Sequence, residues 1–92
     1  MTELYTLCFY VPTSSLEACK DSLFAVGAGT YPGGLYSHVC FETRGTSQFI
    51  PTAGATPNIG KEGEIIRQEE VKVEMSCDGR KVADEAVQEL KR

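Results

Sequence analysis

The stretch LYTLCFYVPTSSLEACKDSLFAVGAG, residues 4–29, predicts a strand that leads directly into a helix. Aromatic and aliphatic residues dominate Leu4–Val11, as is typical of a strand, and Pro12 ends the run. Ser14 and Glu17 then match a capping box, in which each side chain bonds the backbone amide of the other residue. Apolar residues follow at helical spacing, so this segment indicates a β-α unit.

Side chains alternate across a strand, so the first strand presents two different faces. One face carries Tyr5, Leu7, Phe9 and Val11, and the other carries Leu4, Thr6, Cys8 and Tyr10. Both faces are largely apolar, which is typical of a strand that is covered on both sides. We therefore expect a central strand, with helices on one flank and another surface on the other.

The rest of the chain adds three extended segments and a second helix. Alternation predicts a strand at Tyr36–Thr43, a tight turn around Gly45 and a short strand at Ser47–Ile50. A longer extended segment covers Glu64–Cys77. After it, Asp78 can cap a helix whose apolar face carries Val82, Ala83, Ala86, Val87 and Leu90.

This order of elements predicts one α+β domain that spans residues 1–92. Helices on one face of an antiparallel sheet fit a ferredoxin-like sandwich with a β-α-β-β-α core. The complete unit has a final strand after the second helix, which we do not find in this chain. Val39 and Phe41 are expected to pack under the helices together with one face of the first strand.

Composition excludes several classes of partner. The net charge of −4 argues against nucleic acid and anionic membranes, because both require a cationic surface. No stretch approaches the about 18 apolar residues of a membrane span, and the N-terminus lacks the basic flank of a signal peptide. We expect a cytoplasmic protein with four reduced cysteines and no cofactor. The cysteine spacings, with a single histidine, support no metal site.

Three motifs could carry chemistry, and each has a simpler interpretation. His38 and Cys40 would share a strand face near Cys8, which suits a nucleophile and its base, a ligand or metal contact, or a histidine that is hydrogen-bonded in the sheet or at a subunit contact. ATPNIGKE, residues 55–62, is close to a phosphate-binding loop but lacks its first glycine and its Ser or Thr, and is typical of an exposed loop. The acidic residues of 62–74 alternate with valines along a strand, as expected for a solvated face.

Excess apolar surface is the strongest functional signal in the pattern. If the helices cover one face of the sheet, an apolar patch remains on the other face, and such patches usually mark association surfaces. A missing last strand would also leave an edge that can pair with another chain. The interface candidates are Leu4, Thr6, Cys8, Tyr10, Tyr36 and Cys40.

Several stretches together resemble the small domain of the Nif-three-like family. They are FYVP at the end of the first strand, the run from His38 to Pro51 that contains TRGTSQFIP, and Asn58-Ile59-Gly60. The chain looks like stand-alone members described as YqfO or CutA-like. The resemblance implies a ferredoxin-like fold related to CutA and PII proteins, and a homo-oligomer, with a trimer favoured and a dimer as the alternative. The family's metal ligands lie in a flanking domain, so no metal site is carried over.

The leading interpretation is a non-enzymatic oligomeric module that binds a small ligand or a partner protein. Its ligand-binding candidates, which cluster on the expected hairpin, are His38, Thr43, Gly45, Thr46 and Gln48. The alternative is a small metal-handling protein or enzyme that uses His38 with Cys40 and Cys8. A third interpretation is a structural assembly domain that binds no ligand.

Overall fold

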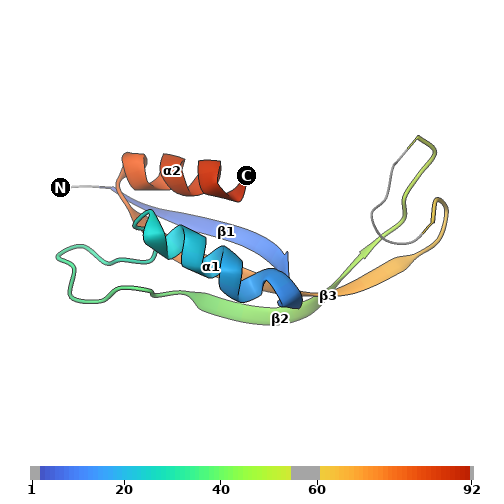
Figure 1. Cartoon of the computed structure of the whole chain (residues 1–92), viewed down its shortest axis with the longest axis horizontal. Coiled ribbons are helices and arrows are strands. Elements are labelled where there is room, and N and C mark those ends of the chain that lie inside the picture. The colour runs from blue at the N-terminus through green and yellow to red at the C-terminus, as the bar shows by residue number, and fades with distance from the viewer. Residues whose placement is uncertain (1–2, 55–60, 92) are drawn as a thin grey trace.

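Two helices pack on one face of a three-stranded sheet in the computed structural model, which describes residues 3–54 and 61–91 (Figure 1). Expectations for the loop at residues 55–60 lie outside the described residues. The chain order is β1 (Leu4–Pro12), the 3-10 turn η1 (Thr13–Ser15), α1 (Leu16–Ala25), β2 (Phe41–Phe49), β3 (Ile66–Asp78) and α2 (Arg80–Leu90). This is an α+β chain, as the sequence predicts.

The strands lie in the order β1-β3-β2, and both pairings are antiparallel. β1 pairs along its whole length with the C-terminal part of β3, from Leu4 opposite Asp78 to Pro12 opposite Glu70. The expectation that the first strand is central was therefore wrong, because β3 is the central strand and β1 lies at an edge. Thirteen residues in β3 give it enough length to pair with both neighbours.

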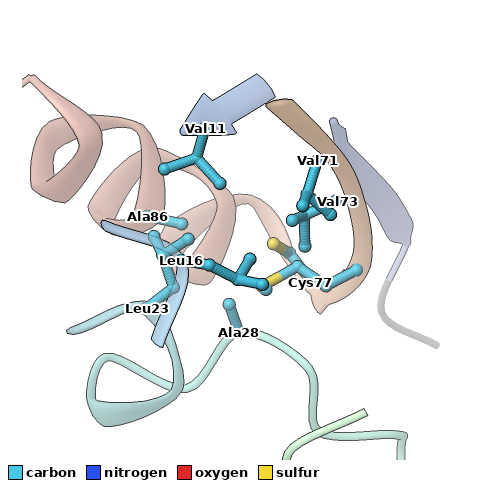
Figure 2. Packing of buried hydrophobic residues seen from close by; sticks show 9 residues of the cluster. Val11, Leu16, Leu23, Ala28, Val71, Val73, Cys77 and Ala86 are labelled. Atoms are coloured by element: carbon cyan, nitrogen blue, oxygen red, sulfur yellow. The ribbon is translucent and has the colours of Figure 1, made fainter. Parts of the chain in front are cut away.

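The core forms where the helices cover β3. Every second residue of β3 from Val71 to Cys77 is buried, as the alternation in the sequence predicts. Figure 2 shows these side chains gathered between β3 and the two helices. The cluster consists of Val11, Leu16, Leu23, Ala28, Val71, Val73, Met75, Cys77 and Ala86.

One strand replaces the predicted strand, turn and strand of residues 36–50. β2 runs without a break from Phe41 to Phe49, and Gly45 lies in its middle, opposite Glu70. The ladder to β3 extends across the whole of β2, so the continuous pairing overrides the local turn preference of the Arg44-Gly45-Thr46 segment. The element order is β-α-β-β-α, one strand fewer than the sequence pattern indicates.

Both helix starts also differ from their predicted caps. α1 begins after η1 with Ser15 as its N-cap residue, and no side chain caps it, so the Ser14 capping box does not form. Asp78 ends β3, and Gly79 takes the N-cap position of α2 with φ of 97°. This backbone conformation favours glycine and turns the chain sharply from the strand into the helix.

The other face of the sheet has no helix over it among the described residues (Figure 1). The hairpin formed by β2 and β3 also extends well past the two helices. None of the described helices is both long and apolar enough to span a membrane.

Candidate functional site: the open face of the sheet

The open sheet face is the surface of the sheet that points away from α1 and α2. It comprises Leu4, Thr6, Cys8 and Tyr10 of β1, Phe41 and Thr43 of β2, and Lys72, Glu74 and Ser76 of β3. Alternation places the β1 residues here because Val11 and its neighbours at every second position face the helices. The prediction that Leu4, Thr6, Cys8 and Tyr10 face outward is confirmed.

Strand register arranges these side chains in rows. Cys8, Glu74 and Phe41 lie in one row, and Tyr10, Lys72 and Thr43 lie in the next. The Lys72 ammonium nitrogen is 3.8 Å from Glu74 Oε1, so a charged pair lies between apolar side chains. Tyr10 is 62% exposed and Phe41 is 66% exposed. These aromatic side chains therefore have little cover within the chain.

Phe41 and Cys40 occupy the opposite faces from those expected. Phe41 points outward, whereas Cys40 is partly buried and packs against the core. Cys40 still shares a face with Glu42, and its Sγ lies 3.9 Å from Glu42 Oε2. The expectation failed because it placed the larger apolar residue under the helices, whereas the register of β2 with β3 turns that residue to the open side.

His38 lies before β2 in an irregular segment, so its predicted place on a strand face was wrong. Its φ is 57°, a left-handed backbone conformation that is uncommon for any residue other than glycine. Its ring packs on Phe24 of α1 with the centroids 4.7 Å apart, and its Nδ1 is 3.1 Å from Ser37 Oγ. Tyr36 lies in the same segment, where its ring meets Tyr31 edge-on at 6.3 Å between centroids. Tyr36 is exposed but does not belong to the sheet.

A hollow of about 200 Å³ adjoins Tyr10 on the open sheet face. It is lined by Tyr10, Thr43, Arg44, Gly45, Thr46, Ser47, Glu70 and Lys72. Three predicted ligand-binding residues, Thr43, Gly45 and Thr46, therefore lie together, whereas His38 and Gln48 are not part of this lining. The Ser47 hydroxyl donates a hydrogen bond to the Glu70 carboxylate. Tyr10 and Lys72 join the hollow from other strands, which only the strand register could have revealed.

An ion pair between charged side chains connects β2 to α1. Lys20 Nζ of α1 lies 2.6 Å from Glu42 Oε2 and 3.1 Å from Glu17 Oε2. The hydrogen bond from Lys20 lowers the pKa of Glu42, and the same contact raises the pKa of Lys20. Burial raises the pKa of the Cys40 thiol. A thiol with a raised pKa is mostly protonated at neutral pH and is therefore a poor nucleophile.

The three residues of the predicted reactive site do not form one cluster. Cys8 is exposed on the open sheet face, Cys40 is partly buried on the other face of the sheet, and His38 packs on α1. Within the described residues, no three histidine, cysteine or acidic side chains are grouped to hold a metal ion.

Comparison with known proteins identifies relatives much longer than this chain. No family model matches it. The chain is 39% identical over 75 residues to a Mycobacterium tuberculosis protein named GTP cyclohydrolase 1 type 2 homolog, and the match covers 82% of this chain and 19% of that protein. A protein of the same name from Halalkalibacterium halodurans is 38% identical over 71 residues, or 77% of this chain and 18% of that protein.

A solved structure supports the same relationship. The fold matches a Bacillus cereus protein related to NIF3 with a TM-score of 0.76 and 27% sequence identity, over 96% of this chain and 21% of that one. The chain thus spans about a fifth of the length of the relatives that it matches.

Proposed function

From the premise that this chain is homologous to one segment of the NIF3-like proteins, we propose that it is a non-enzymatic, homo-oligomeric binding module. Its open sheet face packs against neighbouring copies of the chain. The observation that carries this proposal is the exposure of Tyr10, Phe41 and Leu4 on the open sheet face. Exposed apolar surface of this kind is typical of interaction sites.

The arrangement of elements supports the finer description as a ferredoxin-like module. In that fold, the order β1-β3-β2 with both helices on one face is the expected result of a β-α-β-β-α chain. The relationship to CutA and PII proteins forms part of the same proposal. It favours a trimer around the open sheet faces, with a dimer as the alternative.

The reaction that the relatives' names mention is not assigned to this segment in our proposal. The chain corresponds to less than a quarter of each relative. Cys40, one of the two candidate nucleophiles of the alternative interpretation, has a pKa raised by burial, and the ring of the single histidine packs on Phe24. The alternative of an enzyme or metal-handling protein would have to bring His38, Cys40 and Cys8 together by a rearrangement. Four free cysteines fit a reducing cytoplasmic location, which we also propose.

A small ligand beside Tyr10 is the second candidate function. Lys72, Thr43 and Ser47 offer a cation and hydroxyl groups within one hollow. Its volume of about 200 Å³ is below the about 300–1,000 Å³ of typical small-molecule sites. A fragment-sized ligand could fit, but the exposed Tyr10 and Phe41 side chains on the same face favour a macromolecular contact. Thermal-shift screening of wild type against Lys72→Met tests this candidate, since a specific ligand should stabilise only the wild type.

Mass in solution tests the main proposal. We expect the wild type to have a multiple of the 10.0 kDa chain mass, and Phe41→Glu to have a lower mass than the wild type. Leu35→Glu is the matched control, because Leu35 is 86% exposed but lies in the segment between α1 and β2, outside the sheet. A wild type that stays at 10.0 kDa over the full accessible concentration range would disprove the proposal.

A further inference from the structure

Within the described residues, one edge of β1 has no neighbouring strand, and two hydrogen bonds show which backbone groups face this free edge. The Gly79 amide donates to the Glu3 carbonyl at 2.8 Å, one step beyond the pair of Leu4 with Asp78. Hydrogen-bonded and non-hydrogen-bonded pairs alternate in an antiparallel ladder. Tyr5, Leu7, Phe9 and Val11 therefore bond to β3, whereas Leu4, Thr6, Cys8 and Tyr10 direct their backbone N–H and C=O groups to the free edge.

A second contact supports this assignment independently. The Ser76 carbonyl, opposite Thr6, accepts the Gly29 amide at 2.7 Å. Gly29 lies on the β2 side of β3, so this carbonyl points away from β1. Thr6 and Ser76 are thus a non-hydrogen-bonded pair, and the N–H and C=O of Thr6 face outward from the sheet edge.

Over Leu4–Val11, the free edge of β1 lacks the charged residues and prolines that usually prevent pairing with other chains, and Pro12 stands only at its end. From Leu4 to Val11 it contains no charged residue and no proline, whereas β2, the other edge strand, carries Glu42, Arg44 and Gly45. Long, uncharged edges are templates for strand addition. In addition, Tyr5, Leu7 and Phe9 are only partly buried, although their partners on β3 are almost fully buried. Apolar surface therefore continues up to the edge, where an added strand would cover it.

We propose that β1 pairs antiparallel with β1 of a second copy of this chain, with the two-fold axis at Leu7. The pairing joins two three-stranded sheets into one continuous sheet. The second copy is the favoured occupant because antiparallel pairing of two identical uncharged strands places no like charges opposite each other, although each chain carries a net charge of −4. The two-fold axis also keeps the helices of both copies on the same face of the joined sheet. This follows because even-numbered residues of β1 lie opposite even-numbered residues, and odd-numbered residues lie opposite odd-numbered ones.

Pro12 decides the register. With the axis at Leu7, Thr6 lies opposite Cys8 and Leu4 lies opposite Tyr10 of the second copy, so all outward-facing groups of these residues are paired. With the axis at Cys8, Pro12 would lie opposite Leu4, and proline has no N–H to donate. This contact is separate from the open sheet face and goes beyond the proposed function, because it uses main-chain groups at the edge.

Disulfide capture tests the pairing directly. Hydrogen-bonded antiparallel pairs have Cα atoms about 5.5 Å apart, within the range that a disulfide spans. We expect oxidised Thr6→Cys to form a covalent dimer in which residue 6 of one copy is linked to Cys8 of the other, identified by peptide mapping of an isotope-mixed sample. Adding Cys8→Ser should abolish the link, and Thr43→Cys on β2 should give no link to Cys8.

Backbone blocking provides the second measurement. Thr6→Pro removes an N–H that faces the free edge and no N–H that bonds to β3, so we expect the folded circular-dichroism spectrum to persist while the dimer is lost. If this variant unfolds, the disulfide result decides. A Thr6→Cys variant without the link to Cys8, or a wild type linked from Cys8 to Cys8, overturns the proposal. A separate variant tests whether the open sheet face is an interface. Phe41→Glu combined with Thr6→Cys should still form the edge disulfide when oxidised, and its mass in the reduced state should be lower than that of Thr6→Cys alone.

Discussion

Lys20 on α1 lies 2.6 Å from Glu42 on β2, and this ion pair connects the first helix to the edge strand next to the open sheet face. Both side chains are largely buried, at 14% exposure for Lys20 and 28% for Glu42. An ion pair with this burial is screened less by solvent than a surface pair. It fixes β2, whose outer side carries Phe41 and Thr43.

Glu42→Gln should lower the free energy of unfolding by about 1 kcal/mol at neutral pH, because it removes a charge-assisted hydrogen bond. The pKa of Glu42 is lowered in the folded chain by the bond from Lys20. Its contribution is therefore complete above its unfolded pKa of about 4.3 and is lost as the pH falls through the lower folded value. Urea unfolding across this range should show wild type and variant converging in acid.

Glu85→Gln is the matched control for that prediction. Glu85 Oε1 lies 3.9 Å from Lys81 Nζ on the exposed side of α2, where an ion pair contributes little to stability. Its stability should stay close to wild type at every pH. A difference for Glu42→Gln that persists undiminished in acid would mean that the charge of Glu42 is not what stabilises the fold.

Gly29→Ala should destabilise the chain far more than Gly33→Ala. A Cβ at Gly29 would lie 2.8 Å from both the Phe24 ring and the Val39 carbonyl oxygen, at a φ of 78°. The backbone strain and the overpacking together cost about 2–5 kcal/mol. Gly33 has a φ of 90° but open space around it, so only strain of about 1–2 kcal/mol applies. Equal losses of stability for the two variants in denaturant unfolding would show that Phe24 and Val39 leave room for a side chain at position 29.

Periodicity predicted the parts of the fold that local pattern controls. Val71, Val73, Met75 and Cys77 alternate with polar residues, so their burial could be predicted, and so could the outward direction of Tyr10. The order of the strands could not be predicted from periodicity, because it depends on which strand pairs with two others. β3 is the central strand, although its outer face carries charges that usually indicate an edge.

The candidate site was predictable only where it lies on regular strands. Thr43 meets Tyr10 and Lys72 because these three residues, distant in the chain, share a row of the sheet, and Gly45 and Thr46 follow Thr43 along β2. The sequence prediction placed His38 wrongly because its left-handed backbone interrupts the alternation before β2. The sequence around a histidine does not by itself indicate that its φ is positive. Two glycines at 33 and 34 mark the irregular segment but do not fix its length.

Tyr10→Asp should dissociate the assembly without unfolding the monomer. Tyr10 lies opposite Lys72, so the new carboxylate can form a cross-strand ion pair, worth about 0.2–1 kcal/mol, within its own chain. The charge would nevertheless be costly to bury against a second copy. Light scattering should report a lower mass for Tyr10→Asp and for Cys8→Asp, and an unchanged mass for Tyr10→Phe. Native mass in both charged variants would show that the open sheet face is not an interface.

Thiol labelling separates the binding module from the enzyme alternative. Burial raises the pKa of Cys40, and it does the same for Cys77, which is fully buried. Since the thiolate is the reactive form, Cys40 should be alkylated more slowly than a free cysteine at neutral pH, and Cys77 only upon unfolding. The rate at Cys40 should increase as the pH rises past about 8.5, the ordinary thiol pKa.

His38→Ala provides the decisive comparison for these rates. The His38 ring packs on Phe24 and its Nδ1 contacts Ser37, so its removal should leave the pH profile of Cys40 alkylation unchanged. A catalytic pair requires the opposite result, because a histidine that activates a thiol lowers its pKa. Rapid alkylation of Cys40 at neutral pH that slows in His38→Ala would therefore favour the enzyme alternative and refute the binding module proposed for this chain.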